Sequence, residues 1–357
     1  MSETIPASGA VPAPPADAMS ADERAAEERD ARGGAAGWGK YILTKAGGAL
    51  CSLVMVIVLG FFAFRILPGD PAKSITSGRQ VTPAQLEAIR HQYGLDQPLI
   101  VQFWKYLTDM LHGDLGTSYV YHEPVTRLIG ERVGPTILLT GSAALLSLLI
   151  GLWLGQRAAW RRNTTFDRVH TGIALIFWSV PTFWFGLLLI FLFSGTLHLL
   201  PSGGMMTAGT SYAGLALVVD VVRHLVLPVI SMTAVSYAQY LVIMRSSLLE
   251  EMNGDYLTVA RAKGLKEDDV RRRHAVPNAL LPTITMIFMT LGGLIGGAVT
   301  VETVFSWPGL GYLTYQALSA PDFPVLQGTF VVFSGIVIIM NFLAEIVYRI
   351  IDPRLRK

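Results

Sequence analysis

The sequence predicts an all-α integral membrane protein with six transmembrane helices and a small helical cap on the extracytoplasmic side. Hydrophobic residues make up 52% of the 357 positions and charged residues only 15%, whereas soluble domains carry about 25% charged residues. The mean hydropathy is +0.46. Charged residues are absent from long blocks of the chain, which is the pattern of helices that cross a bilayer. The net charge of +2 is too small to indicate a nucleic-acid partner.

The N-terminal segment differs in composition from the rest of the chain. Residues 1–37 are rich in Ala, Pro and Gly and contain no apolar run long enough for a signal-peptide core. Such a segment buries too little apolar surface to offset its chain entropy. We therefore expect a disordered cytoplasmic tail, with at most a short helix over 21–32, followed by a membrane domain over 38–357.

Six apolar blocks are each long enough to cross the hydrocarbon core, which takes about 20 helical residues. The predicted spans cover residues 46–64, 133–156, 171–193, 224–244, 278–301 and 325–348. Pro181 lies in the middle of the third span, where it removes a backbone hydrogen bond and kinks a helix. A helix kinked in this way either lines a transport pathway or is bent only to pack against its neighbours.

The distribution of Lys and Arg over the short loops predicts the orientation, because basic residues concentrate on the cytoplasmic side. Basic residues cluster after the second span, after the fourth span and at the C-terminus, and they are scarce after the third and fifth spans. Both termini are therefore predicted to be cytoplasmic. The first outer loop, 65–132, is long enough to cross the membrane regardless of its charge.

The first outer loop is predicted to form the helical cap. Thr82, Pro83 and Gln85 follow the pattern of a capping box with proline at the first helical position, which starts a helix that stops at Gly94. A second helix is expected from Pro98 to about residue 111. The cap either covers the membrane domain or receives a partner protein.

The cytoplasmic loop 245–282 between the fourth and fifth spans is the most informative segment. Asp255 is expected to be the N-cap of a short helix over 256–263, and Gly264 is expected to end it in the left-handed conformation. A short helix with small residues can sit in a groove on a soluble motor and transmit its movement to the adjoining spans. The residues predicted to make this coupling contact are Asp255, Tyr256, Thr258, Ala260, Arg261, Lys263, Gly264 and Leu265.

This loop resembles the EAA loop of ABC importer permeases, whose pattern is Glu-Ala-Ala, three residues, Gly, nine residues, Ile, one residue, Leu-Pro. Gly264 stands at the glycine and Ala260 at the second alanine, while Thr258 replaces the glutamate. The strings Ala-Arg-Ala-Lys-Gly-Leu at 260–265 and Arg-His-Ala-x-x-Asn-Ala-Leu-Leu-Pro at 273–282 are similar to the peptide and nickel branch of these permeases.

The resemblance extends over residues 38–357 and is closest to the first type of permease in that branch, the one with a long outer loop. Leu-Pro-Gly-Asp-Pro at 67–71, Gly-Asp-Leu-Gly-Thr-Ser at 113–118 and Glu-Thr-Val-Phe-Ser-Trp-Pro-Gly-Leu-Gly at 302–311 all match it. It implies a bacterial cytoplasmic membrane protein that imports di- or oligopeptides by alternating access. Permeases for nickel chelates and glutathione share these strings.

The resemblance also implies the partners. They are a second homologous permease, two ATPase subunits or domains on the cytoplasmic face, an extracytoplasmic substrate-binding protein and the lipid bilayer. ATP and Mg²⁺ are expected on the ATPase subunits, so this chain is expected to bind no cofactor or metal and to catalyse no reaction.

Four residues are candidates for the pathway or its gate. Pro181 kinks a span, Gly293 and Gly297 allow close approach of helices on the fifth span, and Glu302 lies near the outer end of that span. Packing, snorkelling or a local ion pair would also account for them. Two other classes remain as alternatives, a proton-driven secondary transporter and a membrane enzyme. The absence of a mid-span carboxylate and of a catalytic constellation counts against both.

Overall fold

The computed structural model describes residues 21–66, 82–92 and 94–351, and this part of the chain is almost entirely helical. It contains no named strand, and its one isolated β-bridge joins Thr117 and Pro124. The elements in chain order are α1 (Ala21–Ile66), α3 (Pro83–Gln92), α4 (Leu99–Leu111), α5 (Val125–Trp160), α6 (Thr165–Ser179), α7 (Thr182–Leu189), the π-helix η1 (Ile190–Thr196), α8 (Leu215–Glu251), α9 (Asp255–Ala262), α10 (Glu267–Asp269), the π-helix η2 (Val270–Ala275), α11 (Val276–Val304), α12 (Leu310–Ser319) and α13 (Phe323–Ile351).

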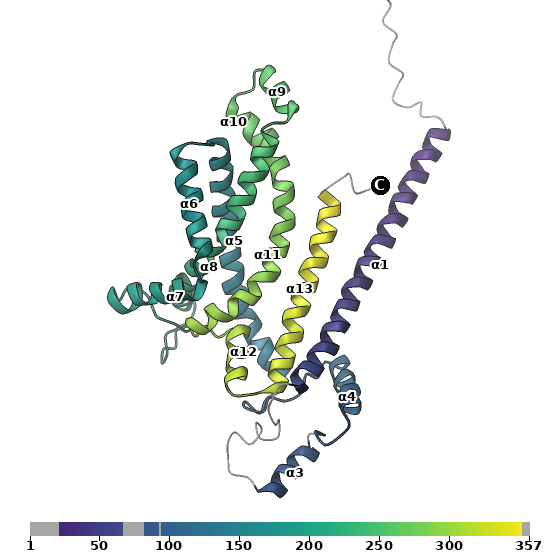
Figure 1. The fold of residues 1–357 in the computed structure, drawn as a ribbon, viewed down its shortest axis with the longest axis vertical. Coiled ribbons are helices and arrows are strands. Elements are labelled where there is room, and N and C mark those ends of the chain that lie inside the picture. Colours follow the sequence, from purple (N-terminus) through teal and green to yellow (C-terminus); the bar gives the residue numbers. More distant parts are fainter. Residues whose placement is uncertain (1–20, 67–81, 93, 352–357) are drawn as a thin grey trace, which may run out of the picture.

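Within the described residues, four single helices are long and apolar enough to span a membrane, and a bent pair of helices makes a fifth candidate. The four single helices cover Trp38–Arg65, Val125–Trp160, Leu215–Glu251 and Phe323–Ile350. The predicted span 278–301 falls within α11. The predicted all-α membrane fold is confirmed. In Figure 1, α9 and α10 lie at one end of the molecule and α3 and α4 at the opposite end.

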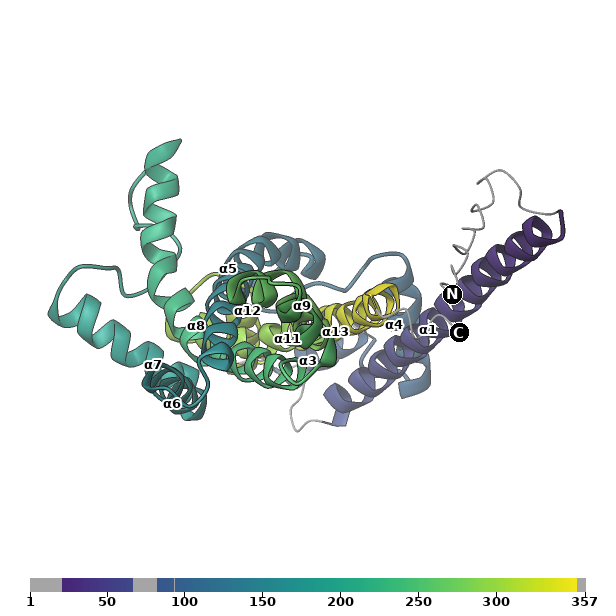
Figure 2. The same cartoon turned by 90° about the horizontal axis from the view of Figure 1, so that it is seen from above.

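The third predicted span, 171–193, is broken into two helices that meet at an angle of 100°. Val180 is extended, with φ −86° and ψ 129°, and Pro181 precedes the first residue of α7. A residue before proline is pushed out of the α region, so the helix stops here instead of kinking. Figure 2 shows α7 leaving the bundle sideways.

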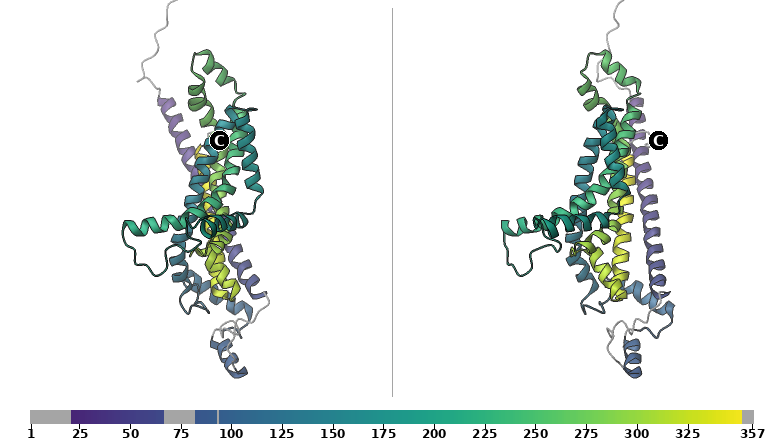
Figure 3. Two further views of the ribbon diagram at one scale, coloured as in Figure 1. Left: turned by 90° about the vertical axis from the view of Figure 1, so that its left-hand side faces the viewer. Right: turned by 60° about the vertical axis from the view of Figure 1, so that its left-hand side comes forward.

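The first helix begins earlier than expected. The segment predicted as a disordered tail, 1–37, is helical from Ala21 onward as part of α1. Its run of Ala, Glu and Arg consists of strong helix formers, which explains why the helix continues beyond the apolar block. Near its middle, α1 is fixed to α13 by an ion pair between Lys45 Nζ and Glu345 Oε1 at 2.7 Å, and Figure 3 shows the two helices side by side.

The centre of the bundle is the close packing of α5 against α8. Small residues recur at every fourth position on the buried side of α5: Ala143, Ser147, Gly151, Gly155 and Ala159. A Cβ atom on Gly151 would lie 2.5 Å from Tyr240 Cβ, and one on Gly155 would lie 2.6 Å from the Leu241 carbonyl oxygen. The two helices therefore approach at backbone distance, as small-residue stripes allow in membranes.

The helical cap forms as the sequence predicts. The Thr82 backbone N–H donates to Gln85 Oε1 at 2.9 Å, and the Gln85 N–H donates to Thr82 Oγ1 at 3.4 Å, which completes the capping box. Gly94 follows α3 with φ +62°. The second predicted helix corresponds to α4, which begins one residue after Pro98.

Candidate coupling site

The predicted coupling helix, α9, is held to the bundle by two side chains on one face. Leu257 and Ala260, three residues apart, are 0% and 5% exposed. They pack in a cluster with Met244 and Leu248 of α8 and with Val270 of η2. The helix is therefore docked onto the end of α8 and onto the entry to α11. Displacement of α9 would move both of these elements.

The C-terminal end of α9 is a complete Schellman motif. Gly264 has φ +80°, its N–H donates to the Arg261 carbonyl at 2.9 Å, and the Leu265 N–H reaches the Ala260 carbonyl at 3.4 Å. This confirms the predicted left-handed conformation of Gly264. The start of the helix differs by one residue, because Asp255 is the first helical residue and Gly254 is the N-cap. The carboxylate of Asp255 still lies in the first turn, where its negative charge interacts favourably with the helix dipole.

The opposite face of α9 is open to solvent. Tyr256, Val259 and Leu265 are 38%, 54% and 37% exposed. The remaining predicted contact residues on this face are also exposed: Asp255, Thr258, Arg261, Lys263 and Gly264. Of the eight predicted residues, Ala260 alone points into the bundle. An exposed apolar surface with flanking charges is the usual composition of a protein interface.

Two side-chain contacts stiffen this open face. Arg261 Nε pairs with Glu267 Oε1 at 2.8 Å, which ties α9 to α10. The Tyr256 hydroxyl donates to the Glu251 carboxylate, which ties the start of α9 to the end of α8. Both pairs are solvent-exposed and contribute little to stability by themselves. Their effect is to fix the direction in which α9 presents its exposed residues.

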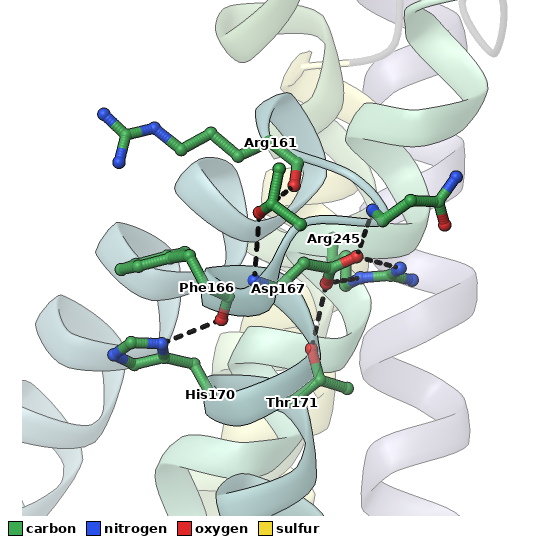
Figure 4. A network of polar contacts seen from close by, with 8 residues as sticks. Arg161, Phe166, Asp167, His170, Thr171 and Arg245 are labelled. Carbon is green, nitrogen blue, oxygen red and sulfur yellow. Dashed lines mark hydrogen bonds and ion pairs between the residues drawn. The ribbon is translucent and has the colours of Figure 1, made fainter.

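An ion pair between the buried Asp167 and the half-buried Arg245 lies below α9 and links α6 to α8 (Figure 4). Arg245 donates to Asp167 through Nε at 2.7 Å and through Nη2 at 2.9 Å. Asp167 is 3% exposed and also accepts from the Asn163 N–H at 3.0 Å and from Thr171 Oγ1 at 3.2 Å. The sequence pattern did not single out this pair. The sequence does carry one signal of this pair: a lone acidic residue stands at the start of one apolar block, and an arginine stands at the end of another.

Glu302 is fully buried near the C-terminal end of α11, and its carboxylate caps the N-terminus of α12. Its oxygens accept from Thr136 Oγ1 at 2.7 Å and from the Tyr312 N–H at 3.0 Å. The Leu310 N–H donates to Thr136 Oγ1 at 2.8 Å. Together Glu302 and Thr136 satisfy amide groups in the first turn of α12 that no helical carbonyl can reach.

Among the residues that the structure describes, no contact links Glu302 to the other pathway candidates. Pro181 lies at the bend between α6 and α7. Gly293 and Gly297 lie within α11, in a stretch whose side-chain surroundings fall outside the described residues. In the described part of the chain, no group of three or more His, Cys, Asp or Glu side chains is placed to hold a metal ion.

Comparison with known proteins assigns the chain to a protein family. Residues 147–357 match the family described as binding-protein-dependent transport system inner membrane component. Residues 39–140 match the family that describes the N-terminal part of such membrane components. The chain belongs to this family of importer permeases, and it is a multi-pass protein of the bacterial inner membrane.

Sequence similarity to known proteins extends over nearly the whole chain. A putative peptide permease protein of Brucella suis biovar 1 is 38% identical over 319 residues, which are 89% of this chain and 99% of that protein. The glutathione transport system permease protein GsiC of Salmonella choleraesuis is 37% identical over 88% of this chain and 98% of that protein. The resemblance to ABC importer permeases is therefore confirmed.

A solved structure supports the fold. An inward-facing MetNI methionine ABC transporter chain aligns with a TM-score of 0.52 at 20% sequence identity, over 63% of this chain and 96% of that chain. At this level of identity the likeness concerns the fold alone.

Proposed function

We propose that this chain is the permease subunit of an ATP-driven importer that takes up di- or oligopeptides by alternating access. The observation that carries the proposal is the docking of α9. Leu257 and Ala260 attach it to α8 and to the entry of α11, while Val259 and Tyr256 face outward. A helix held in this way transmits the closure of a soluble motor to the membrane helices as a rigid-body movement.

The proposed assembly supplies what the chain lacks. Two ATPase subunits or domains bind ATP and Mg²⁺ and contact the exposed face of α9. A second homologous permease completes the pathway, and an extracytoplasmic binding protein delivers the cargo. The chain itself performs no chemical reaction. Both termini and the loop 245–282 are cytoplasmic in this arrangement, in agreement with the basic residues of that loop.

Peptide cargo is supported by the names of the relatives, one a putative peptide permease and another a glutathione permease. Glutathione is itself a small peptide, so both names point to the same class of cargo. Nickel chelates remain an alternative cargo.

Uptake by proteoliposomes tests the proposal. Vesicles would contain this chain with its partner subunits, and entry of a labelled dipeptide would be measured with ATP on the side of the ATPase subunits. Gly264→Pro removes an N–H that donates to Arg261 and forbids the observed φ of +80°, so we expect loss of uptake by a complex that still assembles.

Gly264→Asn is the matched control, because asparagine tolerates the left-handed region, and it should retain most of the uptake. Uptake that requires a proton gradient and proceeds without ATP would overturn the importer assignment in favour of a secondary transporter. Competition by glutathione or by a nickel chelate would identify the alternative cargo.

A further inference from the structure

The cap helix α4 has an unpartnered apolar stripe. Ile100, Trp104, Leu107 and Leu111 follow the spacing i, i+4, i+7 and i+11, which places them on one side of the helix. Ile100, Trp104 and Leu111 are 58%, 60% and 78% exposed. A contiguous stripe of this kind marks contact with a protein or with lipid.

The other side of α4 is polar and lines a cavity of about 270 Å³. Four residues at the spacing i, i+3, i+4 and i+7 face it: Gln102, Lys105, Tyr106 and Asp109. Arg65 at the end of α1 and Gln327 in α13 line the same cavity. The cavity therefore lies between the cap and the outer ends of two membrane helices.

Several buried groups in this cavity lack hydrogen-bond partners in the described part of the chain. The side-chain oxygen of Gln102 and the side-chain nitrogen of Gln327 are unsatisfied. The Tyr106 hydroxyl approaches Gln327 without a hydrogen bond of good geometry, and burial raises the pKa of Tyr106 to about 12. Arg65 rests on the Phe61 ring at 5.3 Å and pairs with no described carboxylate. Buried polar groups normally have partners, so these atoms, together with Arg65, give the cavity a polar lining that suits a polar ligand better than an apolar one.

The apolar stripe continues the lipid-facing surface of α1. The ring of Phe62 stacks on Phe103 of α4 at 5.8 Å, so the two helices are in direct contact. Upstream on α1, Met55 and Leu59 are 61% and 55% exposed, as expected of residues that face acyl chains. Figure 3 shows α4 beside the end of α1. Trp and Tyr, as at positions 104 and 106, are typical of the membrane–water interface.

We propose that α4 is an interfacial helix of the outer leaflet and that the cavity beside it binds the headgroup of a zwitterionic phospholipid. Arg65 and Lys105 would contact the phosphate, and Asp109 and Asp114 the headgroup ammonium. These two basic and two acidic residues sum to no net charge, which favours a headgroup of no net charge over an anionic one. The inference rests on the topology of the proposed function, and its tests measure lipid contact instead of transport. The more polar helix α3 is left free for a partner protein.

Spin labelling of the whole complex in bilayers tests the position of α4. The single cysteine, Cys51, is first replaced by serine, and labels are then placed by Leu111→Cys on the stripe and by Glu87→Cys on α3. We expect the label at 111 to be accessible to oxygen and shielded from a water-soluble nickel reagent, and the label at 87 to show the reverse. A label at 111 that the nickel reagent reaches until the binding protein is added would overturn the proposal, because the stripe would then be a protein-docking surface.

Lipid retention tests the cavity. The purified complex would be titrated in detergent with short-chain phosphatidylethanolamine, phosphatidylglycerol or inorganic phosphate, and bound lipid counted by native mass spectrometry. We expect selective retention of phosphatidylethanolamine and at least a fivefold loss in Lys105→Gln, with no change in Thr108→Val, which lies outside the cavity lining. Equal retention of phosphatidylglycerol would overturn the zwitterion assignment. Displacement by inorganic phosphate would identify a free phosphate site and overturn the lipid assignment.

Discussion

Arg245 and Asp167 form a two-point ion pair, with N–O distances of 2.7 and 2.9 Å, that joins the end of α8 to the start of α6. α9, the proposed coupling helix, begins only four residues after α8 ends, so this pair fixes the base from which α9 projects. The guanidinium fork matches both carboxylate oxygens, a geometry that lysine cannot reproduce. The pair therefore connects the coupling loop with the broken span formed by α6 and α7.

Asp167→Asn should destabilise the protein and uncouple transport. The substitution removes two charge-assisted hydrogen bonds and leaves Arg245, whose side chain is 28% exposed, to be compensated in part by water, which costs on the order of 2 kcal/mol. We expect a lower melting temperature for the complex and less uptake per ATP hydrolysed. Arg245→Lys keeps the charge but loses the fork, so its effect should be smaller and in the same direction. Wild-type melting and coupling in Asp167→Asn would contradict this role.

The two faces of α9 should respond differently to substitution. Val259→Asp places a charge on the exposed face, so we expect normal stability but weaker binding of the ATPase subunits, measured by co-purification. Leu257→Ala removes a buried side chain and should cost about 2–5 kcal/mol, with loss of stability before any loss of binding. Equal effects of the two variants on stability would show that α9 has no free face.

The end of the coupling helix could be predicted from sequence because its determinants are local. Gly264 follows a short amphipathic helix, and the hydrogen bonds that it completes reach back only three to five residues. The capping box at Thr82 is local in the same sense. The pair Asp167–Arg245 is separated by 78 positions, and the contact of Thr136 with Glu302 by 166 positions. Such contacts depend on how helices pack, which residue spacing does not encode.

The broken third span shows a different limit of prediction from sequence. Apolar composition predicts a continuous membrane segment over 171–193, and it also identifies Pro181 as a disturbance. Composition does not determine whether the chain resumes its direction after a proline. Here Val180 adopts an extended conformation and α7 runs in a new direction, so the structure has a 100° bend in place of a kink. Proline's effect on the preceding residue was the decisive local factor.

The cap of α12 gives a third prediction. A Cβ atom on Gly309 would collide with the carboxylate of Glu302, which is fully buried and cannot move away without losing its hydrogen bonds. Gly309→Ala should therefore lower the stability of the complex markedly, by about 2 kcal/mol or more. Glu302→Gln keeps an acceptor oxygen of the same shape and should cost less, about 1 kcal/mol. A stable Gly309→Ala variant that loses uptake alone would instead assign Glu302 to the gate.

The packing interface between α5 and α8 gives the last prediction, and a second glycine of α5 serves as its control. Gly151 and Gly141 both lie within α5, but a Cβ atom on Gly151 meets Tyr240 Cβ at 2.5 Å and the Tyr237 carbonyl oxygen at 2.6 Å, whereas one on Gly141 meets nothing within 4 Å. Gly151→Ala should force the helices apart, because backbone atoms cannot yield as a flexible side chain can. Gly141→Ala should be neutral or stabilising by about 1 kcal/mol through its higher helix propensity. The melting temperature of Gly151→Ala should fall, while that of Gly141→Ala should stay level or rise. An equal fall in both would show that α5 responds to any added methyl group, and not to the close contact with α8 in particular.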